Sequence, residues 1–155
     1  MIPVKELMTT KVITFEEDAS LEEVAQALAE HRITGAPVLG EDGHVIGIVS
    51  EVDVITKKGK TVRDIMSRHV ISVTEDTGID EAARILAGER IRRLPVLRAG
   101  RMVGLISRSD VLEFFAHTQW TCATCGHWER GLEAPTVCAL CQGSDFRLER
   151  GSPGH

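Results

Sequence analysis

The chain contains one unit of about 60 residues twice, and this repeat constrains the fold more than any other feature. At a shift of 58 positions the coinciding residues include Met8 with Met66, Ile13 with Ile71, Leu28 with Leu86 and Pro37 with Pro95. One residue is lost in the second copy after Pro95, as is common in loops, so Asp53 meets Asp110. A unit of this size is marginally stable alone, so we expect two pseudo-symmetric copies that share a core.

Each copy predicts the element order β-α-β-β-α, a mixed α/β (α+β) class. In the first copy, Val12–Phe15 predicts a short strand, and Ser20 is a candidate N-cap for the helix that follows. Pro37–Leu39 and Val45–Val49, separated by a glycine-containing turn, predict a hairpin.

The second strand of each hairpin continues into a Gly-h-h-Ser-x-x-Asp segment, where h is apolar. The two segments are Gly47–Asp53 and Gly104–Asp110, with helices predicted over Val52–Lys57 and Ser109–His117. The glycine permits a close backbone approach, and the serine stands where an N-cap belongs. A hydroxyl, free backbone N–H groups and a carboxylate then meet at a strand-to-helix junction, which can hold a phosphate and a ribose.

These motifs, given twice in register, resemble a tandem pair of cystathionine-β-synthase (CBS) domains, a Bateman module. The resemblance implies a non-catalytic regulatory protein that binds AMP, ADP, ATP or S-adenosylmethionine in two clefts and forms a homodimer. It gives CBS repeats over 1–58 and 59–118. Outside the resemblance, the cysteines described below predict a metal-binding domain over 119–150, and composition predicts a disordered tail over 151–155.

The resemblance also implies the ligand-binding residues. Asp53 and Asp110 would bind ribose hydroxyls, whereas Ser50 and Ser107 would contact phosphate. Arg93 and Arg108 add positive charge to the second copy. The residues that would line the base and the apolar side of the clefts are Ile13, Thr14, Ile71, Ser72, Ala36, Pro37, Leu94 and Pro95.

The four cysteines form two C-x-x-C pairs near the carboxyl end. They are Cys122, Cys125, Cys138 and Cys141. In a chain without an export signal this spacing predicts a tetrahedral four-thiolate metal site rather than disulfides. We expect Gly126 and Gly143 to supply the positive φ that such turns need.

The cysteine segment resembles a zinc ribbon, and more closely a rubredoxin-like tail. Either zinc or iron suits four sulfur ligands. Zinc would be structural and would give a surface for a protein partner or for assembly, whereas iron would make electron transfer on a CBS scaffold the alternative function. A DNA-associated regulator is a second alternative, although residues 119–155 carry three arginines against four acidic residues, which disfavours a phosphate backbone.

Composition excludes other classes. The formal net charge of −5 argues against a general nucleic-acid binder. No apolar run approaches the ~20 residues that span a membrane, and the first residues lack a signal-peptide pattern, so we expect a cytoplasmic protein without a membrane partner. No nucleophile–base pair is visible in the sequence, so no enzyme is predicted.

Overall fold

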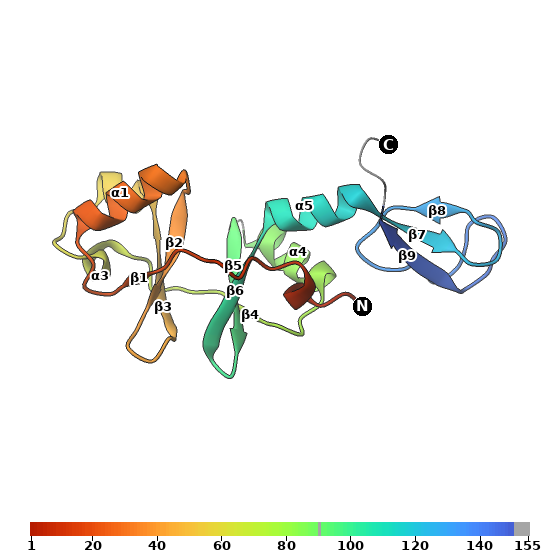
Figure 1. Cartoon of the computed structure of the whole chain (residues 1–155), viewed down its shortest axis with the longest axis horizontal. Helices are drawn as coiled ribbons and strands as arrows, with labels where there is room; N and C mark the ends of the chain where they lie inside the picture. Colours follow the sequence, from red (N-terminus) through yellow and green to blue (C-terminus); the bar gives the residue numbers. More distant parts are fainter. Residues whose placement is uncertain (90, 151–155) are drawn as a thin grey trace. The chain divides into compact units, whose positions relative to one another are not determined.

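The first copy of the repeat forms a three-stranded sheet with helices in the computed structural model of the chain (Figure 1). The structure describes residues 1–89 and 91–150. The elements up to the second copy are η1 (Val4–Glu6), β1 (Phe15–Glu16), α1 (Leu21–His31), β2 (Gly35–Leu39), β3 (Val45–Ser50), α2 (Glu51–Thr56) and α3 (Val62–Ile65). Strand β2 lies between a parallel β1 and an antiparallel β3, as the hairpin prediction required.

The second copy repeats this order, and a separate small sheet follows it. The remaining elements are β4 (Val73–Thr74), α4 (Ile79–Gly88), β5 (Arg93–Arg98), β6 (Arg101–Ser107), α5 (Arg108–His117), β7 (Thr118–Cys122), β8 (Trp128–Glu129) and β9 (Phe146–Arg150). The sheet orders are β4-β5-β6 and β8-β7-β9, so the predicted mixed α/β class is confirmed. None of the described helices is both long and apolar enough to cross a bilayer.

Strand β1 is shorter than the sequence predicts. Only Phe15 and Glu16 pair with β2, opposite Val38 and Leu39, so the predicted strand over Val12–Phe15 is wrong except at its last residue. The register places Pro37 next along β2, and proline has no N–H to donate to a neighbouring strand. The ladder therefore stops there.

The helices begin where the sequence predicts, within one residue. The Ser20 hydroxyl accepts a hydrogen bond from the Glu23 N–H at 3.1 Å, which confirms the predicted N-cap of α1. Helices α2 and α5 begin at Glu51 and Arg108, one residue earlier than predicted, because the capping serine directly precedes each. A side-chain cap of this kind contributes about 1 kcal/mol to helix stability.

The segment that leads into each copy hydrogen-bonds to the other copy. The hydrogen bonds are Val4 N–H to Thr77 C=O (2.8 Å), Thr9 N–H to Leu105 C=O (2.8 Å), Val62 N–H to Ala19 C=O (2.8 Å) and Ser67 N–H to Ile48 C=O (2.9 Å). The exchange is reciprocal and follows the 58-residue shift, since Val4 corresponds to Val62 and Thr9 to Ser67. Each leading segment thus satisfies backbone groups of the partner repeat.

The core of the first copy includes side chains of this exchanged segment. The buried cluster comprises Phe15, Ala19, Val24, Leu28, Ala36, Val38, Val49, Val62, Ile65 and Met66. Gly47 lies against it, and a Cβ built on Gly47 would be 2.5 Å from the Met66 sulfur. The predicted close approach at this glycine is therefore present, and the atoms that require it come from the second copy.

The described residues group into two compact units that do not follow the repeat boundaries. One contains Met1–Met8 and the described residues of Glu75–Leu94 and Ile106–His155, and the other contains Thr9–Thr74 and Pro95–Leu105. The exchange of leading segments explains why Met1–Met8 group with the α4 region. The domain boundaries drawn from the sequence remain predictions, and the predicted tail over 151–155 lies outside the described residues.

Candidate ligand clefts and metal centre

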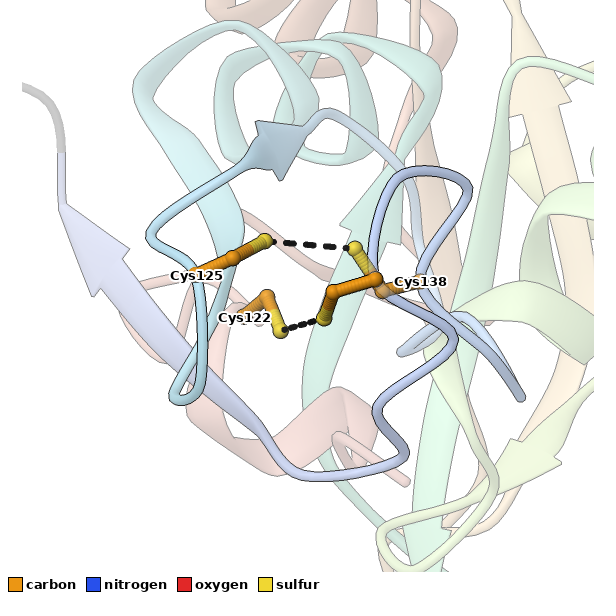
Figure 2. Close-up of side chains that lie close together, drawn as sticks. Cys122, Cys125 and Cys138 are labelled. Atoms are coloured by element: carbon orange, nitrogen blue, oxygen red, sulfur yellow. Dashed lines mark hydrogen bonds between the residues drawn. The ribbon is translucent and has the colours of Figure 1, made fainter.

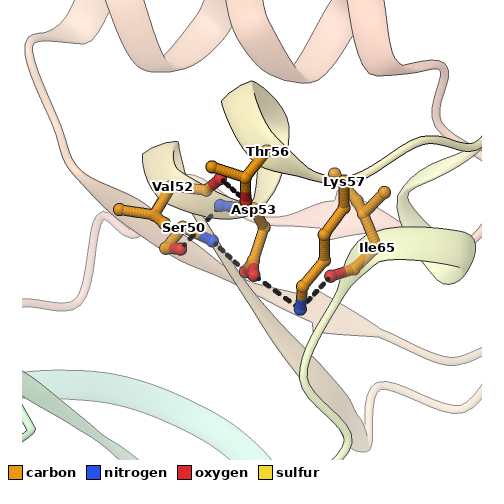
Figure 3. Close-up of polar contacts among 6 residues, drawn as sticks. All are labelled: Ser50, Val52, Asp53, Thr56, Lys57 and Ile65. Atoms are coloured by element: carbon orange, nitrogen blue, oxygen red, sulfur yellow. Dashed lines mark hydrogen bonds and ion pairs between the residues drawn. The ribbon is translucent and has the colours of Figure 1, made fainter.

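The first Ser-x-x-Asp segment forms a reciprocal cap at the junction of β3 and α2. Figure 3 shows the carboxylate of Asp53 between the Ser50 backbone and the Lys57 ammonium group. The Ser50 N–H donates to Asp53 Oδ2 at 2.9 Å, and the Asp53 N–H donates to the Ser50 hydroxyl at 3.1 Å. Lys57 Nζ lies 2.8 Å from Asp53 Oδ1 and also donates to the Ile65 carbonyl at 3.2 Å. This lysine is not among the predicted site residues, although the sequence shows its i,i+4 spacing from Asp53.

These contacts keep Asp53 ionised. Burial is the largest single influence and raises the pKa of Asp53, but the hydrogen bonds from Lys57 and Ser50 together outweigh it and lower the pKa below its usual value. Each carboxylate oxygen has two lone pairs, and the Ser50 N–H and the Lys57 ammonium group occupy one on each oxygen. Each oxygen therefore has acceptor capacity beyond these two contacts.

The sheet brings the other predicted residues of the first copy to the same end. Ser50, at the end of β3, pairs with Gly35 at the start of β2, next to Ala36 and Pro37. Ile13 and Thr14 directly precede β1, which runs parallel to β2. Both residues lie outside the paired part of β1, which begins with Phe15 opposite Val38. The interruption at Pro37 thus leaves both residues outside the β1–β2 ladder, at the sheet end that holds Ser50.

The second copy repeats the cap with a different neighbour. The Ser107 N–H donates to Asp110 Oδ2 at 2.9 Å, and the Asp110 N–H donates to the Ser107 hydroxyl at 3.2 Å. The position that corresponds to Lys57 holds Phe114, which is buried. Among the described residues no partner reaches Asp110 Oδ1, so its carboxylate is less satisfied than that of Asp53.

The remaining predicted residues of the second copy are placed by their own elements. Ile71 and Ser72 directly precede β4, and Arg93, Leu94 and Pro95 form the first half of β5. Pro95 lies next along β5 from the first β4–β5 pair, Val73 with Val96, so the same interruption recurs in this copy.

Arg108 is directed to the backbone of α4. Its Nη2 donates to the Leu86 carbonyl at 3.1 Å, and the side chain lines a cavity with Ala83, Leu86 and Val111. Its predicted place among the ligand-binding residues of the second copy remains a prediction.

The four cysteines converge as the spacing predicts. Their sulfur atoms all lie within 4.8 Å of one another. Cys122 Sγ lies 3.6 Å from Cys141 Sγ, and Cys125 Sγ lies 3.6 Å from Cys138 Sγ (Figure 2). A disulfide needs about 2.05 Å, whereas Zn–S bonds of about 2.3 Å in a tetrahedron place sulfurs about 3.8 Å apart. The donor set therefore fits a four-thiolate metal ion.

The backbone of the two turns favours thiolates. The N–H groups of Cys125 and Thr124 lower the pKa of the Cys122 thiol to about 6. The Cys141 and Leu140 N–H groups lower the pKa of Cys138 in the same way. A bound cation is what allows all four sulfurs to ionise at this distance from one another.

The turn geometry corrects one prediction. Gly126 has a φ of 79°, as expected, and its N–H donates to the Cys122 carbonyl at 2.9 Å. The equivalent residue of the second turn is Gln142, with a φ of 62° and an N–H bonded to the Cys138 carbonyl, whereas Gly143 is not in the left-handed region. Gly143 is needed for space instead, since a Cβ there would lie 3.2 Å from Cys141 Sγ.

Two similar sheets, each followed by the same serine–aspartate cap, define a protein built from two tandem α/β repeats. Comparison with known proteins identifies the family of these repeats. The CBS domain matches residues 4–59 and again residues 62–117. The chain belongs to the CBS domain family as a tandem pair, which confirms the resemblance. The four-cysteine ribbon lies beyond the matched residues.

Several proteins are similar in sequence to this chain, and the similarity covers only part of each of them. An uncharacterised protein of Methanocaldococcus jannaschii is 31% identical over 117 residues, which are 72% of this chain and 42% of that protein. An uncharacterised protein of Methanopyrus kandleri is 33% identical, over 72% of this chain and 62% of that protein. The inosine-5'-monophosphate dehydrogenase of Thermoplasma acidophilum is 38% identical over 65% of this chain, but only 21% of the enzyme. The chain thus spans less than two thirds of these relatives.

Two solved structures are similar in fold and were determined with adenosyl compounds. CBSX2 in complex with AMP has a TM-score of 0.69 and 27% identity, covering 73% of this chain and 95% of that chain. The CBS domain pair of protein MJ0100, in complex with 5'-methylthioadenosine and S-adenosyl-L-methionine, has a TM-score of 0.68 and 29% identity, covering 75% of this chain and 97% of that chain.

Proposed function

We propose that the chain is a non-catalytic sensor that binds adenosyl compounds at its two Ser-x-x-Asp junctions. The observation that carries this proposal is the doubled cap, in which Asp53 and Asp110 keep acceptor capacity beside a helix N-terminus. Ribose hydroxyls would donate to these carboxylates. Ser50 and Ser107 would contact phosphate where the ligand has one.

Two further features support an adenosyl ligand. Ile13 and Thr14 lie outside the β1–β2 ladder at the same sheet end as Ser50, which suits recognition of the edge of a base by their backbone. The similar CBS pairs were solved with AMP, and with 5'-methylthioadenosine and S-adenosylmethionine. A catalytic role has less support, because the match to the dehydrogenase covers only a minor part of that enzyme.

The four-cysteine ribbon would be a metal-stabilised domain that transmits the ligand-bound state of the CBS pair to a partner protein or to another copy of the chain. A closed shell of four thiolates leaves no coordination position for a substrate, so zinc there would be structural. The ribbon would serve docking or assembly. A ligand that binds one conformation of the chain more tightly than another would change how the ribbon is presented, to the extent that the two affinities differ. A homodimer remains a prediction that light scattering tests, and a cytoplasmic location remains one that cell fractionation tests.

Replacing either aspartate should weaken binding of AMP or S-adenosylmethionine. For Asp110→Ala and Asp53→Ala we expect the affinity of the altered junction to fall about tenfold or more, because a charge-assisted hydrogen bond to the ribose is lost. Titration calorimetry on the metal-loaded full chain measures this loss.

The chain offers a matched control for this experiment. Asp64 caps α3 with the same chemistry, since its Oδ2 accepts from the Thr61 N–H at 3.0 Å, yet no ligand is proposed there. Asp64→Ala should lower stability and leave ligand affinity unchanged. Equal affinities for wild type and both junction variants would mean that the aspartates are helix caps only.

A further inference from the structure

A hollow in the unit that contains α5 adds a feature that the family relationship does not supply. It has a volume of about 340 Å³ and lies between the N-terminal segment, one face of α5 and strand β9 of the ribbon. Asp110 is on its wall, and Phe114 and Thr118 are its buried side chains. Small-molecule sites typically have volumes of about 300–1,000 Å³, so the hollow is large enough for a ligand.

Strand β9 presents one of its two faces to this hollow. Leu148 and Arg150 line it, whereas Arg147 and Glu149, which alternate with them along the strand, do not. This is the alternation of a β-strand. Pairing of β9 with β7 holds it in place, with Arg150 opposite Thr118, directly after the end of α5. The ribbon is therefore one wall of the hollow that contains Asp110.

The charges in the hollow are mixed. The acidic side chains are Glu6, Asp110 and Glu113, and the basic ones are Arg150 and the imidazole of His117. Among the described residues no ion pair or side-chain hydrogen bond engages Glu113 or Arg150, so both remain available to a ligand. A phosphate group placed in this hollow, rather than at Ser107 outside its lining, would face three carboxylates, which disfavours it there.

Asp110, Glu113 and Arg150 follow one another along the hollow in this order. Glu113 follows Asp110 by three residues and so lies on the same face of α5, about one turn further on. Arg150 stands across from the end of α5. A ligand whose ribose reaches Asp110 would thus extend an arm past the Glu113 carboxylate toward the Arg150 guanidinium.

We propose that this hollow, with the ribbon as one wall, binds an adenosyl compound whose arm carries both a cation and a carboxylate. S-Adenosylmethionine has this chemistry, with a sulfonium, an ammonium and a carboxylate group. Glu113 and Glu6 attract the cations, Arg150 binds the carboxylate and Leu148 covers the arm. The inference rests on the proposed function, because it takes Asp110 as the ribose-binding residue. It adds Arg150 of the ribbon as a specificity residue.

The test compares S-adenosylmethionine with 5'-methylthioadenosine on the metal-loaded full chain. The second compound has the same adenosine group but a neutral thioether in place of the charged arm. Titration calorimetry should show tighter binding of S-adenosylmethionine to the wild type. In Arg150→Ala that affinity should fall about tenfold, whereas the affinity for 5'-methylthioadenosine stays within about twofold, because one charge-assisted contact is lost.

Two variants complete the design. Arg147→Ala removes a guanidinium from the other face of β9 and should change neither affinity. Glu113→Gln should weaken S-adenosylmethionine alone, since it removes only the charge near the cation.

The outcomes separate the inference from the proposed function. The inference is overturned if Arg150→Ala leaves the affinity for S-adenosylmethionine unchanged, or lowers both affinities equally. In that case a loss of 5'-methylthioadenosine binding in Asp110→Ala would still support the proposed function. If Asp110→Ala binds both compounds as the wild type does, the ribose assignment fails, and the inference fails with it.

Discussion

Removal of the metal should unfold the ribbon and leave the CBS pair folded. The ribbon has a very small core, in which Trp120, Cys122 and Cys138 are buried. Domains of this size depend on their metal, and zinc contributes about 10–16 kcal/mol to the folding of zinc-finger peptides at pH 7. We therefore expect chelation, or Cys138→Ser, to abolish the fold of β7–β9.

The chain carries its own reporter for this experiment. It has two tryptophans and no tyrosine, and both tryptophans, Trp120 and Trp128, are in the ribbon. Trp120 Nε1 donates to the Gly131 carbonyl at 3.0 Å, so unfolding should shift the tryptophan emission to longer wavelength. Far-UV circular dichroism, which is dominated by the helices of the pair, should change little.

A matched variant excludes a general effect of serine in the second turn. Ala139→Ser alters an exposed neighbour of Cys138 and should keep both the metal and the emission spectrum. An unchanged spectrum after complete chelation would contradict a metal-dependent ribbon. Elemental analysis of the same samples also decides between zinc and iron, and an iron-loaded, coloured protein would support the electron-transfer alternative.

Gly47→Ala should destabilise the CBS pair strongly, although it adds only one methyl group. A Cβ at this position would lie 2.5 Å from the Met66 sulfur and 2.9 Å from the Ser67 carbonyl oxygen. The Met66 side chain is flexible, but the Ser67 carbonyl belongs to a backbone pair with Ile48. We expect a loss of about 3 kcal/mol in the free energy of unfolding, at the upper end of the cost of overpacking.

Urea denaturation followed by circular dichroism measures this loss. Gly88→Ala is the control, because a Cβ at the end of α4 would meet no atom within 4 Å. That change should be neutral or slightly stabilising, since alanine favours a helix. Equal stabilities for the two variants would contradict the close approach of the second leading segment to β3.

Local chemistry explains which features could be predicted from the sequence. The caps at Ser20, Ser50 and Ser107 depend on residues three positions apart, so their spacing is visible in the chain. The cysteine cage is also local, because each C-x-x-C turn places two sulfurs together. The repeat then supplies each element of the pair twice, so each copy supports the assignment of the other.

The features that sequence analysis missed depend on tertiary contacts. The early end of the β1 ladder depends on Pro37 lying across from the preceding residue, a register that a single strand does not reveal. The exchange of leading segments involves residues far apart in the chain, such as Val4 with Thr77. The sequence indicates Gly143 rather than Gln142 as the left-handed residue of the second turn, because glycine is the usual choice there.

The wall that β9 gives to the Asp110 hollow was missed for a similar reason. Nothing in the sequence places Arg150 beside α5, since that position follows from the pairing of β9 with β7. The ribbon resemblance assigns the segment to metal binding, docking or assembly, and gives it no contact with a ligand of the pair.

The central claim is that the two aspartates hold an adenosyl ligand, and thermal unfolding with and without ligand tests it most directly. A ligand that binds only the native state stabilises it and so raises Tm. At a free ligand concentration of one hundred times Kd, the stabilisation is about 2.7 kcal/mol. We predict that AMP or S-adenosylmethionine raises Tm of the wild type and leaves Tm of Asp53→Ala/Asp110→Ala unchanged. An equal rise in both proteins, or none in the wild type, would contradict the account.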